Sequence, residues 1–541
     1  MRNTESIRKF FNSNTALEDE NWDTYVSDQD YVRENKDKLD YDYITSSNQE
    51  IKSSLSKIDK KNWHNLDIEK DSVPGTSVER AYNELLNELK GKKVIVAVID
   101  TGLDIDHRSL SENIWINKDE KVNGKDDDNN GYIDDIHGWN YLGSSYNETR
   151  DMTRILRDNK INNRKYNLVE EEIQKEIKNS KEQLNILNYY IQILDESKEL
   201  LSDYLDNDNF SIQDVNNIET VDPKLNRAKN IYKDFDFYGY TKEYLNEGID
   251  QYNDFINYHF NVEFNGRTTN DDIYDINDRN YGDNNINNTK ESESHSTHVS
   301  GIISGNRKIE DGNKGINNLA EIMVLRAVPN GDEYDKDVAL AIRYAVDNGA
   351  KIINGSFGKY FSSNPEWVID AIRYASDNDV LFIAGAGNES KDLDSLSNDN
   401  YPNDQYFNKA EFSDTFIKVG ASSINLDENF TAYFSNYGKI NVDIFAPGVD
   451  IYSSMPNNKY KFQDGTSMAS PVVAGIASLI MSYFPRLSAK KVKEIILESG
   501  IDIDLEIGNL GDKKNFNEYS KSGKLINAYN ALILASKSRR K

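Results

Sequence analysis

"KKVIVAVIDTG", residues 92–102, contains six consecutive apolar residues, Val94 to Ile99, before Asp100 and a Thr-Gly turn. An unbroken apolar run of this length is typical of a strand that is buried on both faces, as the strands of a parallel sheet are. The stretch therefore predicts an α/β fold in which helices cover both faces of the sheet.

Further apolar runs and helical patterns alternate along the chain. Helical patterns lie between several of the runs, and strand–helix–strand spacing of this kind predicts a mostly parallel sheet with helices on both faces. The runs are IMVLRAV (322–328), KIINGSFG (351–358), VLFIAGAGN (380–388) and FIKVGASS (416–423), and the helical patterns cover residues 337–350 and 365–379.

Composition excludes several classes of protein. The 541 residues exceed one ordinary domain, and the formal net charge of -28 argues against a nucleic-acid partner, because phosphate binding needs clustered Lys and Arg. The chain has no cysteine, so disulfides, thiolate metal sites and cysteine nucleophiles are excluded.

The start of the chain, MRNTESIRKFFNSNT, has no apolar core of a signal peptide, and no stretch is expected to span a membrane. We therefore expect either a cytoplasmic protein or an exported one whose leader is absent from this sequence.

Residues 143–290 interrupt the α/β pattern. Apolar residues three, four or seven apart, from Ile173 to Leu205, predict a long helix, and an aromatic-rich helical stretch follows at 235–260. Asn, Asp and Gly then dominate residues 277–290, which indicates a loop. We interpret 143–290 as a helical insertion.

Three polar residues stand where catalytic side chains would be expected. Asp100 ends the first strand, His295 begins a helical pattern, and Ser467 lies near the start of another helix after Gly465 and Thr466. Each also has an ordinary structural interpretation: a capping Asp, a hydrogen-bonded core His, and an N-cap Ser. A zinc site at His295 and His298 lacks both the HExxH pattern and cysteine ligands.

Taken together, the three residues occur in the chain order Asp, His, Ser, which is one of the known orders of a serine-hydrolase triad. Serine becomes a nucleophile when a base removes its proton, and imidazole does this near neutral pH. A carboxylate fixes the imidazole tautomer and stabilises the imidazolium. Free helix N–H groups near Ser467 would stabilise an oxyanion.

These segments resemble the motifs of the subtilisin-like (subtilase, S8) family of serine endopeptidases. The Asp motif is VIVAVIDTG, HSTHVSG (295–301) is similar to the His motif, and GTSMASP (465–471) matches the Ser motif. The resemblance covers roughly 91–142 and 291–500, and it implies that His295 is the base and His298 a structural neighbour. It implies no cofactor for catalysis.

The resemblance implies further site residues. AGAGNES (384–390) is similar to the oxyanion segment, which makes Asn388 the side-chain donor to the oxyanion. NGSFG (354–358) resembles the strand that pairs with an extended peptide or unfolded protein substrate, through Ser356, Phe357 and Gly358. The walls of the first specificity pocket would be Ala384, Gly385 and Ala386.

Two features depart from the family pattern. Ser296 stands in place of the usual glycine beside the base, and Ser300 replaces an alanine. The long insertion separates Asp100 from His295. An alternative function is therefore a catalytically weak or inactive subtilase-fold protein that binds peptides. A nucleotide-binding α/β protein is disfavoured, because the Gly-rich phosphate loop is missing. No recognisable inhibitory propeptide precedes Asp100.

The segment KDDDNNGYIDDIHGW, residues 125–139, predicts a calcium loop. Its oxygen-bearing residues alternate as in the first part of an EF-hand, and Gly131 is at the sixth position. His137 occupies the twelfth position, where an acid is expected, and Asp135 is a substitute; the alternative is a solvated acidic turn. The predicted ligands are Asp126, Asp128, Asn130, Tyr132 and Asp134.

The predicted organisation follows from these assignments. Because the insertion enters between the Asp100 strand and the His295 helix, both of its ends are expected near the cleft. It is interpreted as a helical lid, or as a passive or partner-binding appendage. A secreted or cell-envelope location is favoured by analogy with the family. The segments are an N-terminal extension packing on the catalytic domain (1–90), the two parts of that domain (91–142 and 291–535), the insertion (143–290) and a basic tail (536–541).

Overall fold

The computed structural model describes residues 60–87, 89–158, 163–398, 400–405, 409–508 and 513–538. Most of the predicted N-terminal extension, residues 1–59, and the end of the basic tail, residues 539–541, lie outside these ranges. The chain divides into two compact units. Unit 1 is Met1–Ser144, Thr268–Pro329 and Glu333–Lys541, and unit 2 is Ser145–Arg267 with Asn330–Asp332.

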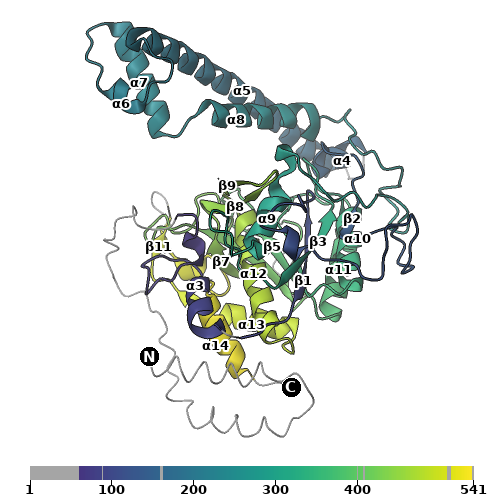
Figure 1. Ribbon diagram of the computed structural model, residues 1–541. Coiled ribbons are helices and arrows are strands. Elements are labelled where there is room, and N and C mark those ends of the chain that lie inside the picture. The colour runs from purple at the N-terminus through teal and green to yellow at the C-terminus, as the bar shows by residue number, and fades with distance from the viewer. Residues whose placement is uncertain are drawn as a thin grey trace. The chain divides into compact units, whose positions relative to one another are not determined.

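Unit 1 contains all the strands and most of the helices of the described chain (Figure 1). Its strands are β1 (Val94–Asp100), β2 (Gly138–Asn140), β3 (Ala320–Arg326), β4 (Ile352–Gly355), β5 (Leu381–Gly385), β6 (Phe416–Ser422), β7 (Ile444–Pro447), β8 (Ile451–Met455), β9 (Lys459–Gln463), β10 (Ile501–Asp502), β11 (Glu506–Ile507), β12 (Lys514–Asn515) and β13 (Lys524–Leu525). Its helices are α3 (Val78–Ala81), α9 (His295–Ser304), α10 (Asp335–Asp347), α11 (Pro365–Asp377), α12 (Thr466–Tyr483), α13 (Ala489–Ser499) and α14 (Ala528–Lys537), with short turns at Trp63–Asn65, Tyr82–Leu86, Ser111–Asn113, Glu291–Glu293 and Phe516–Glu518.

Nine strands form one sheet in the order β10-β13-β7-β6-β5-β4-β1-β3-β2, and every pair except β10–β13 is parallel. The predicted mostly parallel α/β sheet is confirmed. Strand β1 lies between β3 and β4, so the strand order reverses at β1. Ligand sites of open α/β sheets form beyond the carboxyl ends of the strands at such a reversal, and Asp100 ends β1 there.

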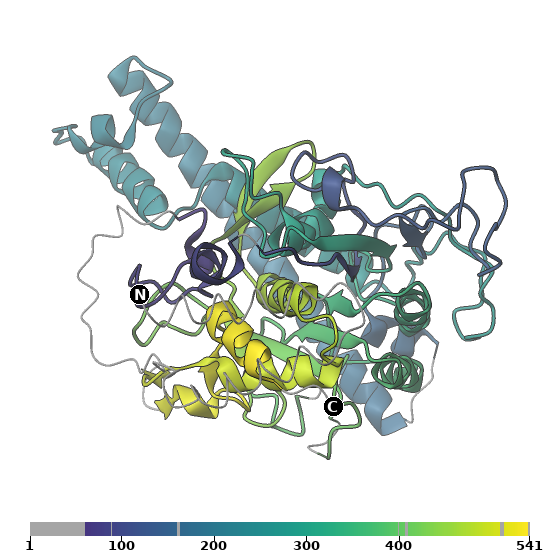
Figure 2. The ribbon, with the colours of Figure 1, turned by 60° about the horizontal axis from the view of Figure 1, so that its bottom comes forward.

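The two faces of β1 pack against different cores. Val96 and Val98 belong to the core that includes α9 and α12, whereas Ala97 and Ile99 belong to the core that includes α10 and α11. Figure 2 shows these helix groups on either side of the strands. The strict alternation explains why the sequence of β1 is apolar throughout, since neither face meets water.

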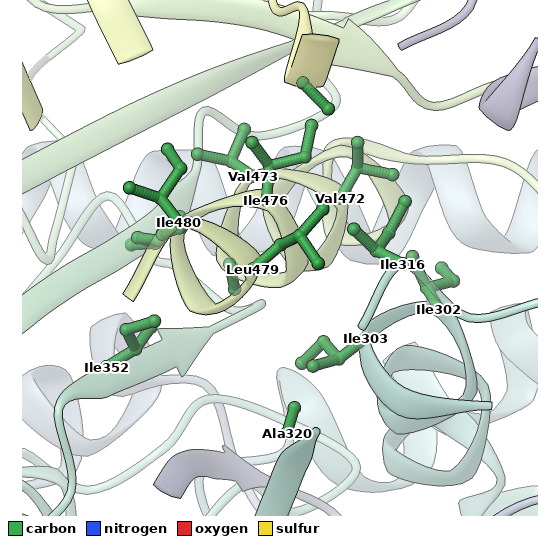
Figure 3. Close-up of a cluster of buried hydrophobic side chains, with 14 of the residues drawn as sticks. Ile302, Ile303, Ile316, Ala320, Ile352, Val472, Val473, Ile476, Leu479 and Ile480 are labelled. Atoms are coloured by element: carbon green, nitrogen blue, oxygen red, sulfur yellow. The ribbon is translucent and has the colours of Figure 1, made fainter. Parts of the chain in front are cut away.

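Helix α12 forms the centre of the first core. Figure 3 shows its apolar side chains packed against residues of α9, β3 and β4. All residues of α12 except Ser467 are buried. This helix is long and apolar enough to cross a membrane, which the sequence analysis did not anticipate, but 94% of it is buried within the chain.

The described part of the N-terminal segment also packs on unit 1. The Trp63 indole donates to the carbonyl of Asp450 at 3.1 Å, and the Tyr82 hydroxyl donates to that of Ile316 at 3.1 Å. Near the other end of the chain, Asn527 Nδ2 donates to Ser77 Oγ at 2.7 Å. Segments far apart in the sequence therefore meet in one core.

Unit 2 is helical. Its long helix α5 packs against α7 and α8 along a stripe of apolar residues that includes Leu194, Leu201 and Leu245. Unit 2 is shorter than the predicted insertion, because residues 268–290 belong to unit 1. Its helices are α4 (Asp151–Arg157), α5 (Asn163–Leu205), α6 (Ile212–Asn216), α7 (Pro223–Phe237), α8 (Lys242–Asp254) and a π-helical turn (Phe255–His259).

Candidate active site

Asp100 and His295 meet at the carboxyl edge of the sheet. The carboxylate of Asp100 is buried, and His295 Nδ1 lies 2.9 Å from each of its oxygens. The backbone N–H of Thr101 also donates to Asp100 Oδ1 at 2.7 Å. Because a carboxylate only accepts hydrogen bonds, it selects the imidazole tautomer that carries its proton on Nδ1.

The electrostatics of this pair favour a basic imidazole. Burial lowers the pKa of His295, but the charge of Asp100 and its hydrogen bond outweigh burial, so that the pKa is raised above its ordinary value. The side chain remains 34% exposed, and Nε2 makes no hydrogen bond to any described residue. The imidazole is therefore free to accept a proton through Nε2.

Ser467 is the second residue of α12, and it is the one position of that helix that is not fully buried. Its Oγ donates to the carbonyl of Ser356 at 3.1 Å, and Ser356 Oγ donates back to the carbonyl of Ser467 at 3.0 Å. This reciprocal pair ties the start of α12 to the end of β4. The family resemblance implied only a substrate-binding role for Ser356, and no sequence pattern indicated this contact.

Asn388 lies beside the start of α12. Its Oδ1 accepts hydrogen bonds from the backbone N–H of Thr466 at 2.9 Å and from Thr466 Oγ1 at 3.0 Å, which orients the amide. A methyl group placed on Gly465 would lie 3.5 Å from both Asn388 Nδ2 and Ser467 N. The Asn388 amide and the backbone N–H of Ser467 therefore lie beside the same small space, which a side chain at position 465 would enter.

The segments at the ends of β4 and β5 are neighbours, since Gly355 of β4 pairs with Ala384 of β5. Among the described residues, no hydrogen bond is made by the backbone groups of Phe357 or Gly358, which follow β4. Ala384 and Ala386 are fully buried, and Gly385 lies against Thr466. The backbone of Ala386 is already paired, because its N–H donates to the carbonyl of Val419 at 2.8 Å and its carbonyl accepts Asn400 Nδ2 at 2.9 Å. The role of 384–386 as pocket walls stays a prediction.

Ser296, His298 and Ser300, which follow His295 in the same helix, are buried. His298 donates from Nε2 to the carbonyl of Lys461 at 3.1 Å, and burial lowers its pKa to about 3, so the ring stays neutral. Ser296 donates its N–H to Thr101 Oγ1 at 3.3 Å. The hydroxyl groups of Ser296 and Ser300 have no partner within the described part of the chain.

A buried polar network supports the Asp100–His295 pair, and the sequence analysis missed it. Arg326, which pairs with Asp100 in the β1–β3 register, donates to Glu293 Oε2 at 2.8 Å and to the carbonyl of Thr101 at 3.1 Å. Thr101 Oγ1 donates to the carbonyl of Glu293 at 2.8 Å. In the sequence, the one indication of this network was Arg326, a charged residue directly after the apolar run 322–325.

Three carboxylates converge near the predicted calcium loop. Glu120, Asp126 and Asp128 each offer an oxygen within 4.8 Å of the others, and Glu120 is buried. Asn130 donates from Nδ2 to Asp128 at 3.1 Å, and Asp134 accepts the backbone N–H groups of residues 123 and 124. Such hard oxygen donors suit Ca²⁺. Glu120 lies outside the quoted loop, so sequence spacing could not identify it.

Tyr132 and Asp135 are not among the three clustered carboxylates, but Asp135 is linked to Asp128 because the amide of Asn130 donates to both, at 3.0 and 3.1 Å. The Tyr132 hydroxyl accepts a hydrogen bond from Tyr141 at 3.2 Å, and its ring packs edge-on against Trp139. Asp135 is buried and accepts the Tyr344 hydroxyl at 2.5 Å. Burial raises the pKa of Asp135.

A family model described as Peptidase S8, the subtilase family, matches residues 91–521. "Thermophilic serine proteinase" of Bacillus sp. (strain AK1) is 34% identical over 262 residues, which are 48% of this chain and 55% of that protein. "Subtilisin DY" of Bacillus licheniformis is 33% identical over 222 residues, which are 40% of this chain and 72% of that protein.

A third relative is much longer than the matched region. "Cell wall-associated protease" of Bacillus subtilis (strain 168) is 32% identical over 234 residues, which are 43% of this chain and 24% of that protein. The chain therefore spans about a quarter of this relative's length and about half of the length of the thermophilic serine proteinase.

Proposed function

The chain belongs to the subtilase family of serine peptidases, and from this we propose that it is an endopeptidase that cleaves peptide bonds through Asp100, His295 and Ser467. The observation that carries the proposal is the placement of His295 Nδ1 at 2.9 Å from both oxygens of Asp100, with Nε2 left open. Ser467, the half-buried second residue of an otherwise buried helix, supplies the nucleophile.

The proposed reaction has two halves. His295 Nε2 takes the hydroxyl proton while Ser467 Oγ forms a bond to the scissile carbonyl carbon. The tetrahedral intermediate collapses, the C–N bond breaks, and the imidazolium returns the proton to the leaving amine. Water then attacks the acyl-enzyme in the same way. Asp100 stabilises the imidazolium throughout.

Charge on the former carbonyl oxygen would be stabilised by the Asn388 amide and the Ser467 N–H. The support for this role is that Thr466 holds the amide by its oxygen, so that Nδ2 is left as the donor. Preorganised donors of this kind need no rearrangement as charge develops.

The substrate would be an extended peptide or an unfolded segment of a protein. Phe357 and Gly358 follow β4 and offer unpaired backbone groups, which suits recognition by strand addition. Gly385 and its neighbours would bound the first specificity pocket. A folded substrate would need local unfolding before it could adopt this extended form.

We further propose that Glu120, Asp126 and Asp128 hold a structural Ca²⁺. Three carboxylates within 4.8 Å repel one another unless a cation lies between them. The ion would stabilise the folded state by mass action, by about 2.7 kcal/mol at 100 times its Kd. It would take no part in peptide hydrolysis.

Calcium titration tests this site. In chelator-treated Ser467→Ala protein, which cannot digest itself, calorimetry is expected to show binding heat, and added Ca²⁺ is expected to raise Tm. Both effects are expected to vanish in Glu120→Gln/Asp126→Asn and to persist in Asp119→Asn, an exposed acid outside the cluster. If the Ser467→Ala protein shows no binding heat and no rise in Tm, the proposed ion is ruled out.

We also place the site of action outside the cytoplasm, in the cell envelope or medium. The support is analogy, since one relative bears the name "Cell wall-associated protease".

Active-site labelling tests the proposed function. A fluorophosphonate probe is expected to label the chain at Ser467, and Ser467→Ala is expected to abolish labelling. The matched control is Ser478→Ala, a buried serine of the same helix whose hydroxyl bonds to the carbonyl of Gly475. If the wild-type chain binds peptides but is not labelled, it is the inactive peptide-binding alternative.

A further inference from the structure

Lys418 is a buried cation that the proposed chemistry does not use. It lies within β6 and is 1% exposed. Its Nζ donates to the carbonyl of Pro402 at 2.5 Å and to Asn400 Oδ1 at 3.2 Å. An ammonium group costs several kcal/mol to bury, so its retention in the core requires compensating partners.

Two buried acids provide the opposite charge. Asp404 and Asp443 both interact with Lys418, and Asp443 Oδ2 accepts the backbone N–H of Lys418 at 2.7 Å. Burial lowers the pKa of Lys418, and the charges of Asp404 and Asp443 oppose this effect and favour the ammonium form. Lys493 and Lys521 face Asp443 from the other side, at 3.7 and 3.4 Å.

The loop that Lys418 holds reaches both segments that would bound the substrate cleft. Asn400, whose oxygen accepts from Lys418, donates from Nδ2 to the carbonyl of Ala386 at 2.9 Å. The next residue, Tyr401, exchanges two backbone hydrogen bonds with Lys359, at 2.8 and 2.9 Å, directly after Gly358. One ammonium group therefore connects, through three consecutive residues, to the ends of both β4 and β5.

We propose that Lys418 is a positioning residue for the first specificity pocket: its ammonium group acts as a built-in cation that fixes the loop 400–402, and through it the backbone of 356–358 and 384–386. This inference rests on the proposed peptidase function. It assigns Lys418 no contact with the substrate. Its effect should appear in substrate binding and in the residue preferred next to the scissile bond.

Lys418→Met tests the role of the charge, because methionine keeps the length of the side chain without the ammonium group. The expected result is a loss of about 10- to 100-fold in kcat/KM, carried mainly by KM, together with a flattened preference across peptides that differ at the residue before the cut. Fluorophosphonate labelling of Ser467 is expected to persist, because its immediate supports are untouched.

The matched control is Lys336→Met. Lys336 is also buried in unit 1 and donates to Asp271 at 2.7 Å, but it contacts neither cleft segment. Lys336→Met is expected to lower the stability of the protein without changing KM or the preference for the residue before the cut. Equal effects of the two variants on KM and preference would overturn the proposal.

Two further variants keep the test decisive if Lys418→Met misfolds. Lys418→Met/Asp404→Asn restores charge balance, and it is expected to fold and still show the raised KM. In Lys418→Ala, methylammonium ions are expected to restore KM by filling the vacated space. Failure of methylammonium to lower KM in a folded Lys418→Ala protein would contradict the cation role.

Hydrogen–deuterium exchange separates this inference from the proposed function, because it needs no turnover. In a Ser467→Ala background, backbone amides of 356–361 and 384–388 are expected to exchange faster with Lys418→Met than with Lys336→Met. Unchanged exchange would overturn the positioning role, even if the chain is a peptidase. Faster exchange in a chain that is never labelled would instead refute only the peptidase assignment.

Discussion

Helices α12 and α5 differ in how much of their surface is buried. Helix α12 has 18 residues, and all except Ser467 are buried. Helix α5 has 43 residues, and its buried positions among those described are six: Val169, Ile173, Ser180, Leu194, Ser197 and Leu201. Tyr189 and Leu200 of α5 are about half exposed, at 51% and 42%.

The difference shows what each helix can position. Contacts on every side fix α12 in rotation and along its axis, so the one residue that reaches the surface, Ser467, has a defined place beside Asn388 and Ser356. Helix α5 is fixed by one stripe, and most of its remaining described surface is exposed, including the apolar side chains of Tyr189 and Leu200. A reactive side chain belongs on the first kind of helix, because catalysis tolerates little misplacement.

The largest expected effect comes from breaking the pair at the carboxyl edge of β1. Asp100→Asn is expected to lower kcat by about 10⁴-fold, as the equivalent change does in trypsin-like enzymes, because the imidazole loses its tautomer. His295 must be neutral to act as a base, so kcat/KM falls as pH drops through its pKa. Since that pKa is raised, the acid limb in the wild type is expected above pH 6.5.

The pH profile distinguishes this cause from simple unfolding. Without the Asp100 charge, burial alone acts on His295 and lowers its pKa, so the acid limb of the residual activity is expected to move to lower pH. The profile of kcat/KM against pH measures this limb. An acid limb at the same pH in Asp100→Asn would contradict the assignment of His295.

The comparison of the helices themselves is tested by one chemical change made on each. Leu479→Ala on α12 removes a fully buried side chain and is expected to lower the free energy of unfolding by about 2–5 kcal/mol. Leu200→Ala on α5 is expected to change it by less than about 1 kcal/mol. Equal losses would show that α5 is as fully packed as α12.

Both variants are best measured in urea, in the Ser467→Ala background. None of the five tryptophans lies within residues 145–267, and the four in the described chain, Trp63, Trp115, Trp139 and Trp367, belong to unit 1. Their fluorescence reports unit 1, while circular dichroism reports the helices of both units. Leu200→Ala is expected to leave the fluorescence transition unchanged.

The smallest expected effect on the chemistry comes from removing most of unit 2. The flanks of this segment meet, since Ser144 Oγ donates to Thr268 Oγ1 at 3.1 Å, and a short Gly-Ser linker should join them. Deletion of 145–267 is expected to leave fluorophosphonate labelling unchanged. Loss of folding in this variant would show that unit 1 depends on unit 2.

The same deletion tests the lid hypothesis, which stays a prediction. A lid would restrict access by folded proteins, so the deletion is expected to raise cleavage of a folded protein relative to a short peptide. An unchanged ratio would leave unit 2 as a stabilising or partner-binding appendage.

The sequence by itself predicted the elements whose patterns are local. The apolar runs identified β1, β3, β4, β5 and β6, because a strand buried on both faces must be apolar at every position. The motifs predicted Asp100, His295 and Ser467 as the catalytic residues, and the choice of His295 rather than His298 came from the resemblance to the family motif. The EF-hand spacing predicted Asp126 and Asp128 as ligands, and both lie in the cluster of three carboxylates.

Only the tertiary structure decided which distant residues meet. Glu120 joins Asp126 and Asp128, Ser356 exchanges hydrogen bonds with Ser467, and Lys418 reaches the loop after residue 399. The physical reason is that periodicity records how one segment meets water or core, whereas these contacts depend on how strands register and helices pack across the whole sheet. A buried lysine within an apolar run shows that a partner must exist, and only the fold shows which one.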